Sequence, residues 1–224
     1  FPDLHIIVLS GYSNFEYART ALRYGVEDYL LKPVEQKTLS DLLSALCLQI
    51  EEERAAHNRD ILSLALNDSP DHNAPFMFRD SGFVLSLITL GTLPPEGTDT
   101  SALVPGRSFR KLWQEAGLEE CFQSVSSVQH LWLIDERSPQ QKFLILHMED
   151  TALSAEFLSM LMKNHLSRHL DGLPFLVLTC CDPISYKDLW TKARFLRSAV
   201  RSVNLPFHQE ALCVNTEHPV EPPD

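Results

Sequence analysis

Short apolar runs and helical spacings alternate along the first 60 residues. The run at residues 5–9 (HIIVL) is typical of a strand that lies covered on both faces of a parallel sheet, and residues 26–31 (VEDYLL) are predicted to form the next strand. Apolar residues recur at helical spacing over residues 15–22, and a second helix is predicted over residues 38–53. Strand, helix, strand and helix with short connections predict one half of a doubly wound α/β sheet, so we expect residues 1–55 to form a first domain.

The second predicted helix carries an apolar seam with coiled-coil-like spacing, formed by Leu39, Leu43, Leu46 and Ile50. We expect this seam to permit self-association through residues 39–50. The next residues, EEERAAHNRD (51–60), prolong the helix with charged groups and little apolar stripe, and DSPDHNAP (68–75) is rich in turn residues. We therefore interpret residues 56–75 as a helical connector and loop.

Beyond the connector, the pattern predicts an α+β domain over residues 76–216. Strands are predicted at 82–90, 131–134, 143–147, 174–179 and 211–214, helices at 109–122, 151–170 and 186–203, and a loop at 92–106. The order is β-α-β-β-α-β followed by α and β, which is typical of a ferredoxin-like or degenerate cyclase-like fold. Residues 217–224 are acidic and rich in proline, so we interpret them as a tail or linker.

The charge balance argues against nucleic-acid binding by either part. The 224 residues carry 19 Lys and Arg against 30 Asp and Glu, a net charge of -11, with 6 basic and 10 acidic side chains in residues 1–60 and 13 and 20 in the rest. Long-range electrostatics would therefore repel DNA and acidic membranes. No apolar run approaches the ~20 residues of a membrane span, so we expect no membrane association.

The five cysteines are scattered and show no C-x-x-C spacing; they are Cys47, Cys121, Cys180, Cys181 and Cys213. A chain of this length does not need a disulfide framework, so we expect reduced thiols in a cytoplasmic protein. The chain begins FPDL without an initiator methionine, and we expect it to be a fragment of a longer protein.

Residues 29–34 read YLLKPV and place Lys32 at the end of an apolar strand. Burying an ammonium without a partner is costly, so an anionic partner is expected. Ser10 ends the preceding strand, and ligand sites of open parallel sheets lie at the carboxyl ends of strands. A hydroxyl and an ammonium at one such edge would suit a phosphoryl group.

The stretch LSGY followed by NFEYARTALRYGVEDYLLKPV resembles the second half of a response-regulator receiver domain. Its sequence is similar to the sequences of receivers that carry an AraC-type helix-turn-helix output. The resemblance implies a flavodoxin-like fold, with Ser10 binding a phosphoryl oxygen, Lys32 pairing with the phosphoaspartate and Tyr29 acting as the aromatic switch. It also implies a cis peptide bond between Lys32 and Pro33.

By the same resemblance, the chain is a fragment of a two-component transcriptional regulator that acts in phosphorelay signal transduction. A sensor histidine kinase would be its partner, and DNA would be bound only by a C-terminal domain that follows Asp224. The phosphoacceptor aspartate and the acidic pair that holds Mg²⁺ would precede Phe1. We therefore expect no catalytic residue, metal site or cofactor in this chain.

Two other functions stay open: a protein-interaction module that uses the 39–50 seam, and a cyclase-like or phosphotransfer enzyme built on the second domain. The enzyme would need paired carboxylates at strand ends. The hairpin DERSPQQK offers only Asp135 and Glu136, without the Gly-Gly-Asp-Glu-Phe signature of diguanylate cyclases.

Two further side-chain pairs carry weaker signals. His165 and His169 have metal-ligand spacing, but no glutamate follows His165, so we interpret them as a solvated helix face. Cys180 and Cys181 are adjacent, and side chains alternate along a strand, so we interpret them as buried small hydrophobes.

Overall fold

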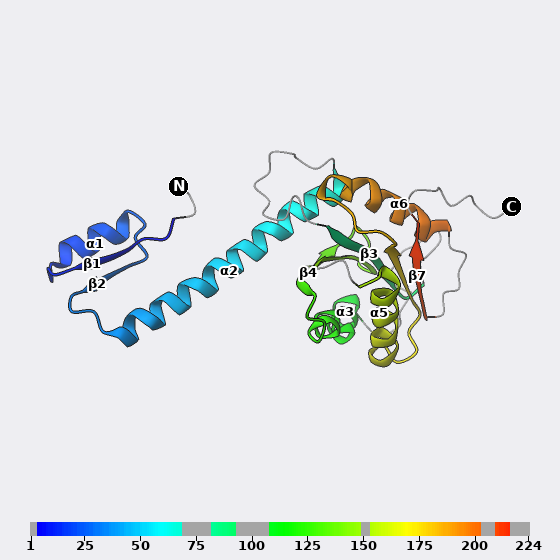
Figure 1. Ribbon diagram of the computed structural model, residues 1–224, viewed down its shortest axis with the longest axis horizontal. Coiled ribbons are helices and arrows are strands. Elements are labelled where there is room, and N and C mark those ends of the chain that lie inside the picture. The colour runs from blue at the N-terminus through cyan, green and yellow to red at the C-terminus, as the bar shows by residue number, and fades with distance from the viewer. Residues whose placement is uncertain (1–3, 69–81, 93–107, 149–152, 203–208, 216–224) are drawn as a thin grey trace. The chain divides into compact units, whose positions relative to one another are not determined.

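The chain divides into two compact units, Phe1–Ala56 and His57–Asp224. The computed structural model describes residues 4–68, 82–92, 108–148, 153–202 and 209–215 (Figure 1). Of the loops and the tail predicted from the sequence, residues 69–75, 93–106 and 217–224 lie outside this description. None of the helices in the described residues is both long enough and apolar enough to span a bilayer.

The first unit contains the strand, helix and strand that the sequence predicts: β1 (Ile7–Ser10), α1 (Phe15–Arg23) and β2 (Asp28–Leu31). Asn14 caps α1, because its side-chain oxygen accepts a hydrogen bond from the Glu16 N–H at 2.9 Å. After α1, Gly25 takes a positive φ of 80°, a conformation that favours glycine. The two strands pair in parallel, with Ser10 opposite Leu31.

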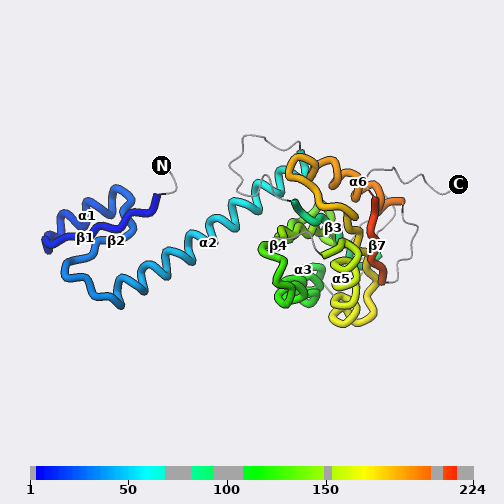
Figure 2. Tube along the Cα trace, in the orientation of Figure 1, coloured from blue at the N-terminus to red at the C-terminus, as the bar shows by residue number. Residues whose placement is uncertain are grey.

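Helix α2 (Gln36–Asn67) is much longer than its predicted core, and its trace runs without a break (Figure 2). The apolar stripe resumes after the charged stretch, and four of its residues lie in the hydrophobic core of the second unit: Ile61, Leu62, Ala65 and Leu66. Their spacing places them on one face of the helix. The predicted connector over residues 56–75 therefore differs from the structure, in which residues 57–67 belong to the second unit.

The second unit is built on a sheet in the order β4-β5-β3-β6-β7. Its strands are β3 (Phe83–Leu90), β4 (Val128–Asp135), β5 (Gln141–Met148), β6 (Phe175–Cys180) and β7 (Gln209–Val214). The hairpin predicted across DERSPQQK is confirmed, because β4 and β5 pair antiparallel. The β6–β7 pair is parallel, and β3 pairs antiparallel with β5 and β6.

Helices cover both faces of this sheet. The helical elements are α3 (Phe109–Ala116), α4 (Leu118–Phe122), α5 (Ala155–His169), a short 3₁₀ helix (Tyr186–Asp188) and α6 (Leu189–Ser202). The end of α2 and α6 share a core with one face, and α3, α4 and α5 share a core with the other. Every residue of β3 is buried, because alternate side chains enter the two cores.

The single helix predicted over residues 109–122 is wrong. Gly117 lies in the left-handed region, with φ 51° and ψ 39°, and separates α3 from α4. A glycine readily adopts this conformation, which ends a helix and lets the chain turn. The turn lets Ala116 and Leu118 both enter the core beneath α5.

Candidate functional site

The carboxyl ends of β1 and β2 form one edge of the parallel pair in the first unit. Ser10 is the last residue of β1, and Lys32 directly follows β2. The Lys32 N–H donates a 2.7 Å hydrogen bond to the Ser10 carbonyl oxygen. The structure therefore brings together, at backbone level, the two residues that the sequence predicts at this edge.

Tyr29 lies on the same face of the pair as Ser10. It stands opposite Val8, two residues before Ser10, and side chains two apart on a strand share a face. The Tyr29 hydroxyl donates a 3.0 Å hydrogen bond to the Tyr12 carbonyl oxygen, and the Tyr12 N–H donates a 3.1 Å bond to Ser10 Oγ. Tyr12 thus joins the two predicted switch residues through its backbone.

Lys32 is exposed, and the Lys32–Pro33 peptide bond is cis. Within the described part of the chain, Lys32 makes no ion pair, so the anionic partner expected for it is not among these residues. A lysine ammonium carries three donors and no acceptor. At this edge it can therefore donate hydrogen bonds to an anion.

Part of this chain is similar in sequence to known proteins. No protein-family model matches it. A segment of the chain is similar to bacterial transcriptional regulatory proteins. It is 38% identical over 52 residues to the uncharacterized transcriptional regulatory protein YesN of Bacillus subtilis (strain 168), and 36% identical over 61 residues to the transcriptional regulatory protein HptR of Staphylococcus aureus (strain NCTC 8325 / PS 47).

These similarities cover a small share of each protein. The YesN match spans 23% of this chain and 14% of the relative, and the HptR match spans 27% and 24%. The chain thus spans a quarter or less of the length of these curated relatives.

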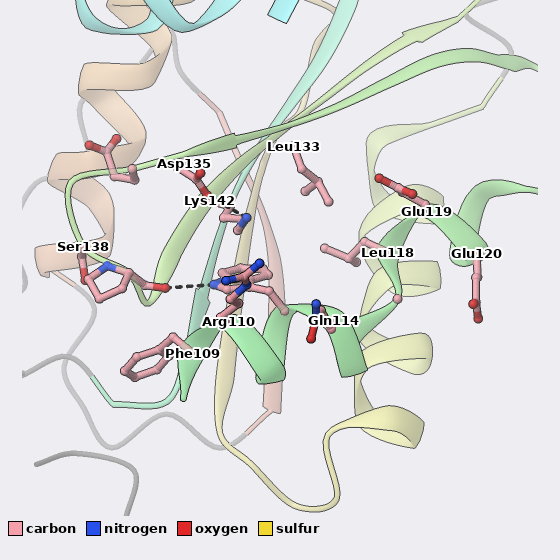
Figure 3. Close-up of a pocket in the computed structure, with 14 residues that line it drawn as sticks. Phe109, Arg110, Gln114, Leu118, Glu119, Glu120, Leu133, Asp135, Ser138 and Lys142 are labelled. Atoms are coloured by element: carbon pink, nitrogen blue, oxygen red, sulfur yellow. Dashed lines mark hydrogen bonds and ion pairs between the residues drawn. The ribbon is translucent and has the colours of Figure 1, made fainter. Parts of the chain in front are cut away.

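The second unit contains a groove of about 790 Å³ between α3, α4 and the β4–β5 hairpin (Figure 3). This volume is in the range of small-molecule sites. Lys142 Nζ lies 2.7 Å from Asp135 Oδ1 and 5.4 Å from the centre of the Trp113 ring. The Trp113 Nε1–H donates a 2.9 Å bond to the Pro139 carbonyl oxygen, so the groove joins α3 to the hairpin. No local signal in the sequence marks this groove, because its walls come from separate segments.

The two carboxylates that an enzyme would need are bound to different cations. Asp135 pairs with Lys142, and Glu136 Oε2 lies 2.6 Å from Arg197 Nε. This arrangement does not supply the free carboxylate pair of a cyclase-like site. Among the described side chains, no group of three or more His, Cys, Asp or Glu residues is placed to hold a metal ion.

The histidine pair on α5 is only partly a solvated face. His169 is exposed, but His165 is half-buried, and its Nε2–H donates a 2.9 Å bond to the Ala116 carbonyl oxygen. Burial lowers the pKa of His165, and the hydrogen bond to Ala116 opposes this shift. The interpretation as a wet helix face therefore fits His169 and not His165, which joins α5 to the end of α3.

The cysteine pair follows the sequence interpretation at one of its two positions. Cys180 is buried, and burial raises the pKa of its thiol to about 12, so it is not a thiolate nucleophile at neutral pH. Cys181 is half-buried and directly follows β6. The interpretation as a buried small hydrophobe therefore fits Cys180 and not Cys181.

Proposed function

We propose that this chain is part of a two-component response regulator that controls transcription. In this proposal, residues 1–55 are the distal half of a flavodoxin-like receiver, and the second unit is a regulatory middle domain with a ferredoxin-like or degenerate cyclase-like strand order. The observation that carries the proposal is the edge at which Ser10, Tyr29 and Lys32 meet. The similarity of a segment to transcriptional regulatory proteins supports it.

The contacts at the edge suggest how a phosphoryl group would be sensed. A phosphoryl oxygen that accepts a hydrogen bond from the Ser10 hydroxyl would reorient a group that now binds the Tyr12 N–H. Tyr12 also accepts the hydroxyl bond of Tyr29, so a shift of this loop would release the tyrosine. Lys32 would balance the charge of the phosphoryl group, because a charge-assisted bond to an ammonium is strong.

The partners follow from this role. A sensor histidine kinase would phosphorylate the complete receiver, whose acidic pair would hold Mg²⁺, and an AraC-type output domain in the longer protein would bind DNA. The whole protein would be a cytoplasmic regulator and not an enzyme. The engagement of Asp135 and Glu136 by separate cations supports this reading over the cyclase-like alternative.

Self-association through residues 39–50 of α2 is part of the proposal. Leu46 in the seam is buried, whereas Leu43 is 46% exposed and is free to pack against a second helix. A seam of this length is short for a stable coiled coil, so association would depend on the rest of the receiver.

The proposal is tested in the longer protein with Lys32→Ala, because the lysine is read as a partner of the phosphoryl group and not as its acceptor. Phosphorylation from acetyl phosphate should persist, while activation of a reporter gene is lost. Lys37→Ala is a matched control, because Lys37 is an exposed lysine in the first turn of α2. Normal activation by Lys32→Ala, or the lack of a strand-end aspartate upstream of Phe1, would refute the receiver assignment.

A further inference from the structure

One arginine on α6 joins three elements of the second unit. Arg197 Nε donates to Glu136 Oε2 at 2.6 Å in the hairpin turn after β4. Its two terminal nitrogens donate to the Leu66 carbonyl oxygen and to Asn67 Oδ1, both at 3.0 Å, at the end of α2. The guanidinium also lies 5.0 Å from the centre of the Phe143 ring in β5. The three nitrogens of this planar group therefore donate to three different partners.

The end of α2 depends on this outside cation. The last four carbonyl groups of a helix have no partner within it, and they carry partial negative charge. Helix α2 has no basic residue in its own last turn. Arg197 binds the Leu66 carbonyl from another helix, and Asn67 completes the cap, because its Nδ2 donates to the Ser63 carbonyl at 2.9 Å.

Glu136 in turn fixes Arg197. The Glu136 side chain is only 6% exposed, and a buried carboxylate needs a charged partner. Its second oxygen accepts from the Arg137 N–H at 2.9 Å, which locks the carboxylate to the hairpin turn. Glu136 and the neighbouring Ser138 and Pro139 also line the groove beside α3. A movement of this turn would therefore pull on the guanidinium that caps α2.

We propose that Glu136 and Arg197 form a latch through which the β4–β5 hairpin fixes the last turn of α2. With the latch closed, the groove wall and the helix end are held together. With the latch open, the hairpin turn and residues 65–68 loosen together, while the rest of the sheet stays folded. The contacts of the latch do not depend on the proposed function, but its role does. Helix α2 begins in the receiver-like unit, so the latch would let the middle domain control the end of that helix.

The test is hydrogen exchange on the complete 224-residue chain carrying Arg197→Gln, Glu136→Gln or both. Arg197→Gln should speed exchange at residues 65–68 on the order of tenfold, which is the loss expected when bonds to a charged group are removed. Glu136→Gln should speed exchange at the same amides, although Glu136 lies in the hairpin. Exchange in β3 should not change. The double variant should resemble the single ones, because both break one latch.

Arg194→Gln is the matched control, because Arg194 lies on the same helix with its guanidinium 4.8 Å from the Trp190 ring centre. Arg197→Lys keeps the positive charge but loses the planar, forked set of donors, so it should give an intermediate effect. This variant replaces the glutamine variants in the test if they fold poorly. The latch is refuted if Glu136→Gln leaves residues 65–68 unchanged, if β3 exchanges equally faster, or if the control matches Arg197→Gln. Since no phosphorylation is involved, this result is independent of the Lys32 test.

Discussion

The second unit should need residues 57–68 to fold, although they belong by sequence to the long helix that begins in the first unit. We expect a fragment of residues 57–224 to be stable, and a fragment of residues 69–224 to be largely unfolded. The two fragments differ only in the last turns of α2, which supply Ile61, Leu62, Ala65 and Leu66 to the core beside α6.

The size of the effect follows from burial. Ile61, Leu62 and Leu66 are 7%, 0% and 1% exposed. Burying one such side chain contributes about 1.5–3 kcal/mol, so the three together contribute roughly 4.5–9 kcal/mol. A typical domain is stable by about 5–15 kcal/mol, and the loss is of the same order. The shorter fragment also loses the Leu66 and Asn67 partners of Arg197.

Urea unfolding followed by tryptophan fluorescence would measure the difference, because Trp113, Trp132 and Trp190 all lie in the second unit. In the longer fragment, Leu62→Ala should cost about 2–5 kcal/mol of unfolding free energy. Leu64→Ala is the control and should change little, because Leu64 is 70% exposed on the same helix. Equal unfolding midpoints for the two fragments would show that this end of α2 is dispensable and would refute the boundary at residue 57.

Three further outcomes are expected. In a dilute monomer, amides of β1 and β2 should exchange much faster than those of β3 and β6, because no residue from 4 to 31 is fully buried; equally strong protection would contradict this. Acetyl phosphate should add no phosphate to this chain by intact-mass analysis, since no aspartate of this sequence matches the phosphoacceptor of the proposed receiver, and an aspartyl adduct would overturn that proposal. Duplex DNA should not bind at micromolar concentration in an anisotropy titration, because the net charge is -11; salt-sensitive binding would disprove it.

The sequence by itself determined the elements whose signals are local. The β1–α1–β2 order and the β4–β5 hairpin both follow from residues within a few positions of one another. The meeting of Ser10 with Lys32 could also be predicted, because the carboxyl ends of neighbouring parallel strands share one edge. In these cases the local pattern is compatible with only one arrangement.

Tertiary structure decided what depends on distant partners. Gly117 could have continued the helix, and only the packing of α3, α4 and α5 on one face of the sheet requires its left-handed turn. Because the middle of α2 is charged, the sequence did not indicate that the last apolar turns of this helix belong to the second unit. Their burial depends on packing against α6. Arg197 lies 61 residues from Glu136 and 131 from Leu66, so its role exists only because the sheet order and the packing of α6 bring those groups together. Local preferences act over a few residues, whereas an ion pair between elements requires the whole core to be assembled.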